Sequence, residues 1–168
     1  LPISETTTDL IDNALLCFLE YPDQLARLRR QPELLGSAIE EVLRFRSPAQ
    51  SMYRSTKREV ELNGRVIPAG KFVLPMIGSA NRDPRHFEEP ERFDIGREPN
   101  PHLAFGHGIH FCLGAALSRM EARVALTDLL EMMGDFRLAS DAPWEPRQAL
   151  HIHGPTRLPL RFEPGARR

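Results

Sequence analysis

The residues best suited to chemistry lie between Phe105 and Gly114, where a glycine-rich loop ends at Cys112 and an apolar-periodic stretch follows directly. This pattern predicts a helix that begins just after the cysteine. Backbone N–H groups in the first turn of a helix lack intrahelical partners, and the helix dipole adds partial positive charge there. Both effects favour a thiolate over a thiol. Cys112 is therefore a candidate nucleophile or metal ligand.

Neighbouring residues leave three uses for this thiolate open. Three histidines lie near in sequence: His102, His107 and His110. One of them could be the base of a nucleophilic cysteine, although such partners usually come from distant segments. The histidine and cysteine spacing fits no familiar zinc pattern. Glycines at 106, 108 and 114 remove side chains and let the backbone approach something large and flat, such as a haem face.

The elements that must position this loop are mostly helical. Helices are expected over residues 5–20, 22–30, 32–46 and from 113 onward. Asn63-Gly64 between two short apolar runs predicts a β-hairpin. Residues 81–104 are rich in Pro, Arg and Asp and predict a long ordered loop with a functional role. The chain is thus expected to be mainly α with a minor β region, in a single unit covering residues 1–168.

Composition narrows the class of protein. The net charge of −1 gives no support for a nucleic-acid partner, and no apolar run is long enough to span a membrane. Two cysteines, Cys17 and Cys112, do not form a disulfide framework, so a reducing, cytoplasmic setting is expected. The chain starts at Leu1 rather than Met, and we expect it to be a fragment or a truncated product.

The pattern Phe105-x-x-Gly108-x-x-x-Cys112-x-Gly114 resembles the haem-binding signature of bacterial cytochromes P-450. The resemblance implies haem b as cofactor, Cys112 as the axial ligand of its iron, and Phe105, Gly106 and Gly114 as parts of the haem surface. It also implies the C-terminal part of that fold: the end of the oxygen-binding helix, the E-x-x-R helix, β-hairpins, the cysteine loop and the proximal helix.

Further residues take roles only through this resemblance. Glu41-x-x-Arg44 resembles the family's E-x-x-R pair, with Arg92 as the third member of a buried structural network. On residues alone, this i, i+3 pair would be read as a solvated ion pair. Three residues match contacts to the haem propionates, for which cations are the suitable partners: Arg54, His102 and His110.

The distal side carries weaker matches. Glu5 and Thr6 resemble the family's acid–alcohol pair, which relays protons during oxygen activation; a helix cap is the alternative. Pro2 and Ile3 stand where the family has Ala-Gly, and that small pair normally opens a groove over the haem. Residues that match substrate-facing segments are Ala49, Gln50, Ser51, Met52, His153, Gly154, Pro155 and Thr156.

The resemblance implies a haem-thiolate monooxygenase that inserts one oxygen atom of O₂ into a small organic substrate. A ferredoxin-type partner would supply electrons, and Arg119 and Arg123 are candidates for its docking face. The alternatives are a truncated haem-binding remnant without turnover, and a metal or interaction module without haem. The family's N-terminal portion is absent from the match, so it is a further candidate partner.

Overall fold

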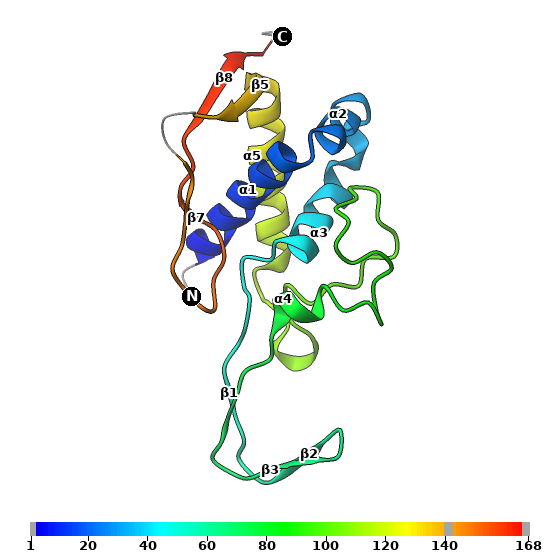
Figure 1. Ribbon diagram of the computed structural model, residues 1–168, viewed down its shortest axis with the longest axis vertical. Helices are drawn as coiled ribbons and strands as arrows, with labels where there is room; N and C mark the ends of the chain where they lie inside the picture. The colour runs from blue at the N-terminus through cyan, green and yellow to red at the C-terminus, as the bar shows by residue number, and fades with distance from the viewer. Residues whose placement is uncertain (1–2, 140–142, 166–168) are drawn as a thin grey trace.

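The computed structural model describes residues 3–139 and 143–165, and it is mainly α with small sheets (Figure 1). The helical elements are α1 (Ile3–Glu20), α2 (Pro22–Arg30), η1 (Pro32–Leu34), α3 (Leu35–Phe45), α4 (Ile77–Ala80), η2 (Gly108–His110) and α5 (Ala115–Met132). The strands are β1 (Arg54–Ser55), β2 (Val60–Leu62), β3 (Arg65–Ile67), β4 (Phe72–Val73), β5 (Met133–Leu138), β6 (Glu145–Pro146), β7 (Pro155–Arg157) and β8 (Leu160–Pro164). The expected fold class is confirmed.

The core forms where α1, α3 and α5 meet. Apolar side chains recur at helical spacing on α1, and Leu10, Ala14 and Phe18 are almost fully buried. They pack against Val42 of α3 and Leu126 of α5, also buried. Burying each large apolar side chain contributes about 1.5–3 kcal/mol. This helical core is the rigid part from which the site is built.

The described strands form four antiparallel pairs: β1–β4, β2–β3, β5–β8 and β6–β7. The expected Asn63-Gly64 hairpin joins β2 to β3, and both turn residues have positive φ, 49° and 73°. Such a turn matches the right-handed twist of the strands it connects. In Figure 1 this hairpin projects from one end of the molecule, and β5 with β8 lies at the other.

The segment from residue 81 to 104 contains no helix or strand, as expected. It is nevertheless ordered by burial, because Phe87, Phe93 and Ile95 are almost fully buried. Asn81 closes the segment on itself: its Oδ1 accepts a hydrogen bond from the backbone N–H of Leu103 at 2.7 Å. No helix in the described ranges, 3–139 and 143–165, is long and apolar enough to cross a membrane.

Candidate functional site

The cysteine loop is a closed turn that presents Cys112 to the outside. Gly106 and Gly108 both have φ near +75°, a region that favours glycine. The backbone N–H of Cys112 donates to the Phe105 carbonyl at 2.9 Å and so closes the loop. The Cys112 side chain is exposed, and α5 begins at Ala115, three residues later. The predicted arrangement of loop, cysteine and helix is therefore present, with the helix start two residues later than expected.

Large apolar side chains around the cysteine are unusually open to solvent. Ile109 and Leu113 are 97% and 102% exposed, and Phe111 is 52% exposed. A contiguous exposed apolar patch marks a place where another group binds. An exposed thiol on such a patch, beside glycines that carry no side chain, fits a large, flat, apolar group with a metal at its centre. The residues present therefore fit a haem.

Two side chains lie against the Phe105 ring of the cysteine loop, and a carboxylate joins them. The Arg119 guanidinium lies 4.5 Å above the centre of the Phe105 ring, and the His102 ring lies 6.3 Å from it. Glu40 joins the two: it accepts hydrogen bonds from Arg119 Nε at 2.6 Å and Nη2 at 2.7 Å, and its Oε2 lies 2.9 Å from His102 Nε2. Through Glu40 of α3, these contacts hold the cysteine loop in place.

Glu40 is therefore held as a carboxylate. Burial alone raises its pKa, but the hydrogen bonds from Arg119 and His102 outweigh burial and lower the pKa to about 2. The Glu40 carboxylate therefore balances the positive charge of Arg119. Arg123, the other expected docking residue, is exposed one turn further along α5.

The candidate propionate contacts fall into two groups. Arg54 and His110 are exposed, and Arg54 donates to the carbonyl of its neighbour Tyr53 at 2.9 Å. In the described ranges, no carboxylate pairs with either side chain. His102 differs because its side chain is only 4% exposed and faces Glu40. Arg54 and His110 are thus open to an added carboxylate.

Glu41 and Arg44 form a fully buried ion pair, as the resemblance implied. Arg44 Nε donates to Glu41 Oε2 at 2.8 Å and Nη2 to Oε1 at 2.9 Å, and both side chains are 0% exposed. Arg44 also donates to the backbone carbonyls of Asn81, Pro90 and Arg92. The pair therefore anchors the long loop to α3, because every buried charge meets a partner.

The third guanidinium in this network was assigned wrongly. Arg97, not Arg92, donates to Glu41, from Nε to Oε1 at 3.2 Å, and its side chain is 12% exposed. The Arg92 side chain is 58% exposed and pairs with Glu89 at the surface. Only the Arg92 carbonyl joins the network. The chain turns at Glu89, whose φ is +44°, and Arg92 Nη1 donates to Glu89 Oε2 at 2.9 Å.

The network reaches the cysteine loop through asparagines that the sequence analysis missed. Asn100 Nδ2 donates to Glu41 Oε2 at 3.0 Å, two residues before His102. Asn81 is fully buried and holds Leu103, as described above. No local motif marks either residue, and only the folded loop brings Asn100 to Glu41 and the Asn81 carbonyl to Arg44. Together they fix the backbone that leads into Phe105.

The distal candidates Glu5 and Thr6 lie in the first turns of α1 and are half-buried. The next residue, Thr7, is buried and its Oγ1 lies 2.9 Å from Ser118 Oγ of α5, which fixes α1 against the helix that follows the cysteine. Glu5 is bound by Arg147, another residue that the sequence analysis missed. Pro2, the departure from the family pattern, lies outside the described residues.

The candidate substrate-facing residues come together from two distant segments. Ala49 bridges Ile152, and the Gln50 N–H donates to the His151 carbonyl at 3.0 Å. Not all of these residues are accessible. Met52 is 37% exposed, whereas the side chain of Ser51 and residues Gly154 and Pro155 are buried.

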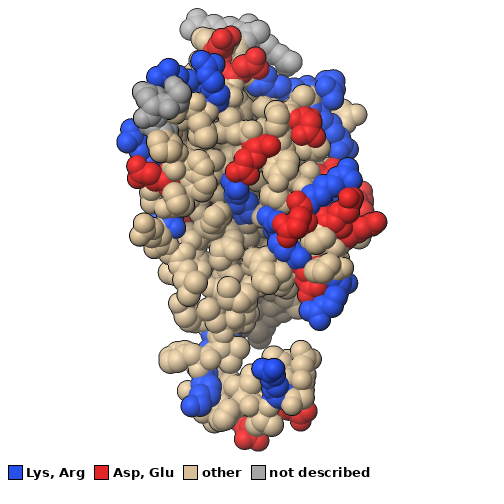
Figure 2. All heavy atoms as spheres, viewed as in Figure 1, with Lys and Arg blue, Asp and Glu red and all other residues tan. Residues whose placement is uncertain are grey.

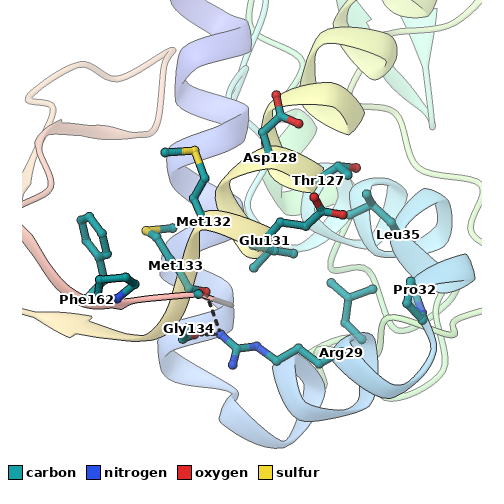
Figure 3. Close-up of a pocket in the computed structure, with 14 residues that line it drawn as sticks. Arg29, Pro32, Leu35, Thr127, Asp128, Glu131, Met132, Met133, Gly134 and Phe162 are labelled. Atoms are coloured by element: carbon teal, nitrogen blue, oxygen red, sulfur yellow. Dashed lines mark hydrogen bonds between the residues drawn. The ribbon is translucent and has the colours of Figure 1, made fainter. Parts of the chain in front are cut away.

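Other features of the structure bear on the alternatives. In the part of the chain that the structure describes, no three His, Cys, Asp or Glu side chains gather to hold a metal ion. A hollow of about 820 Å³ lies between α2, the end of α5 and the β5–β8 pair (Figure 3). None of the predicted site residues lines it.

Comparison with known proteins identifies the class. Residues 27–142 match the family description of cytochrome P-450. The chain belongs to the cytochrome P-450 family, whose members bind haem b. It is 45% identical over 159 residues to the biotin biosynthesis cytochrome P-450 of Bacillus subtilis (strain 168), covering 95% of this chain and 40% of that protein. It is 50% identical over 166 residues to cytochrome P-450 107B1 of Saccharopolyspora erythraea, covering 96% and 40%.

Comparison with solved structures gives the same result as comparison of sequences. The crystal structure of CYP109E1 from Bacillus megaterium, in complex with testosterone, matches with a TM-score of 0.90 and 46% identity, over 93% of this chain and 43% of that one. The chain therefore spans about 40% of the length of the relatives it matches.

Proposed function

We propose that the protein carrying this chain is a haem-thiolate monooxygenase that inserts one oxygen atom of O₂ into a small organic substrate. The observation that carries the proposal is the exposed Cys112 at the centre of an open apolar patch, on a loop braced by the Glu41–Arg44 network. A thiolate-ligated haem supplies the cleavage of the O–O bond. The residues of this chain bind the haem and provide the side chains around it.

Each proposed role rests on a described contact or exposure. Cys112 supplies the iron ligand, and Phe105, Gly106 and Gly114 form the surface beneath the ring. The exposed side chains of Arg54 and His110 bind propionates. His102 adds a third contact only by giving up one of its two bonds, from Nε2 to Glu40 or from the Ala104 N–H to Nδ1. On the distal side, the Glu5 carboxyl and the Thr6 hydroxyl hold and pass protons. Two protons, with the two electrons from the partner, are consumed as the second oxygen atom of O₂ leaves as water.

For electron supply we propose a ferredoxin-type partner that docks on the side of α5. Arg123 is the exposed cation there, whereas Arg119 is already paired with Glu40. Arg123→Glu should slow reduction by ferredoxin at low salt and leave reduction by dithionite unchanged, because only the protein partner uses the docking charge. The reducing compartment that suits Cys17 and Cys112 as free thiols is the cytoplasm.

The test is product formation from ¹⁸O₂. We expect one labelled oxygen atom in the product when ferredoxin and its reductase supply electrons, and none with Cys112→Ser. A protein that forms the haem-thiolate complex but gives no labelled product with any substrate of a broad panel would be the truncated remnant. A protein that binds no haem would contradict both.

A further inference from the structure

Arg147 links two carboxylates on successive turns of α1. Its Nη1 donates to Glu5 Oε1 at 2.9 Å, and its Nη2 donates to Asp9 Oδ1 at 3.1 Å. Residues four apart share one face of a helix, so a single planar guanidinium can serve both. Arg147 comes from the segment after β6, more than a hundred residues away along the chain.

Asp9 is the buried one of the two carboxylates that Arg147 binds. Its side chain is 1% exposed, and burial raises its pKa above the usual value even though the hydrogen bond and charge of Arg147 lower it. A buried carboxylate is tolerated only with such a partner. The turn that carries Arg147 is packed directly onto Asp9, because a Cβ at Gly154 would lie 2.4 Å from Asp9 Oδ1. The Arg147 N–H also donates to the Gly154 carbonyl at 2.8 Å.

Glu5 is the more exposed of the two carboxylates that Arg147 binds. Its side chain is 36% exposed, and Arg147 is the ion-pair partner that the structure gives it. Without that partner, a glutamate in the first turns of a helix can rotate freely into solvent. An arginine anchored at Asp9 restricts it to one orientation.

We propose that Arg147 is a positioning residue that holds the Glu5 carboxylate in place for proton transfer, with Asp9 as its buried anchor. The proposal rests on the proposed function, in which Glu5 carries a proton. The proposal also links the segment that matches the family's substrate contact to the proton-carrying residue. Arg147 and Gly154 belong to one loop, so this segment also sets the position of Glu5.

The first test needs no haem. Unfolding midpoints in urea are measured for Glu5→Gln, Arg147→Gln and the double variant. We expect the two shifts to be non-additive, with Glu5→Gln having little further effect once Arg147 is gone. Additive shifts would overturn the proposal. If Arg147→Gln does not fold, the cycle is run with Arg147→Lys, which keeps the charge but not the two-pronged geometry.

The second test uses the haem-loaded protein and separates positioning from stability. We expect the share of consumed oxygen that appears in product to fall about tenfold in Arg147→Gln, with the remainder released as peroxide, because the proton donor is misplaced. Arg147→Lys should recover part of the loss. Arg157→Gln, which removes an exposed charge from the neighbouring strand β7, is the matched control and should change nothing.

The outcomes keep the two proposals apart. If Arg147→Gln folds, binds haem and couples oxygen as well as the unchanged protein does, Arg147 has no positioning role, although the monooxygenase proposal stands. If the unchanged protein gives no product, the monooxygenase proposal fails. The urea cycle still decides whether Arg147 holds Glu5.

Discussion

At the residue scale, neighbours in the chain shape the loop that carries Cys112. Glycines with positive φ, a cysteine and a helix start are adjacent in the chain, so their spacing determines their geometry. The brace behind the loop was not predicted, because Glu40 reaches His102 and Arg119 across 62 and 79 residues. Such a contact exists only once α3 and α5 have packed together.

The pKa of Glu40 gives a prediction at this scale. Its folded value of about 2 lies below the ordinary 4.5, so its ionisation stabilises the fold above pH 5, and this contribution is lost as the pH falls toward 2. Glu40→Gln should therefore lower the free energy of unfolding by about 1–2 kcal/mol at pH 6, allowing for partial exposure. The difference should shrink as pH falls.

Urea unfolding of both proteins between pH 6 and pH 3 measures this difference. Glu33→Gln, a change at the exposed glutamate of η1, is the control and should show no such trend. A difference that is constant with pH would show that Glu40 contributes through packing and not through its charge.

At the element scale, the helices and the Asn63-Gly64 hairpin followed from local patterns, and the long loop followed from its composition. What could not be predicted was the path of that loop. Arg92 and Arg97 both lie within it at similar distances from Glu41 in sequence, and spacing alone does not show which guanidinium turns inward. Arg97 reaches Glu41 only in the folded loop, 56 residues away along the chain.

The two arginines therefore make a matched pair of variants. Arg97→Gln removes a charge partner of the buried Glu41 and should cost about 3 kcal/mol of unfolding free energy. Arg92→Gln removes a surface ion pair and should cost less than about 1 kcal/mol. Urea denaturation distinguishes them. Equal losses, or a larger loss for Arg92→Gln, would contradict the structure of the network.

At the scale of the whole molecule, part of the surface is apolar and exposed, which suits a surface that another part of a protein covers. Figure 2 shows charged side chains gathered over the upper and right-hand parts of one face, with few over the lower part above the hairpin. Along α5, three apolar residues at helical spacing are also exposed: Leu117, Met120 and Val124. Because the chain spans about 40% of the length of its relatives, we expect the rest of such a protein to cover this stripe.

This expectation can be tested by supplying the missing part. The 168-residue chain alone should bind haem weakly, and adding the N-terminal segment of a relative such as CYP109E1 should raise the affinity at least tenfold. Met120→Gln should reduce the gain, because the stripe is then less apolar. Leu62→Gln in the hairpin, at the same 57% exposure, is the control and should leave the gain unchanged. Tight haem binding by the chain alone would refute the expectation.

The central claim is that Cys112 is the ligand of a haem iron, and one spectrum tests it most directly. The protein is loaded with haem, reduced and exposed to carbon monoxide. We expect a strongly red-shifted Soret band from thiolate ligation, retained in Cys17→Ala, where the changed cysteine is buried, and lost in Cys112→Ser. An unchanged red-shifted band in Cys112→Ser would contradict the assignment.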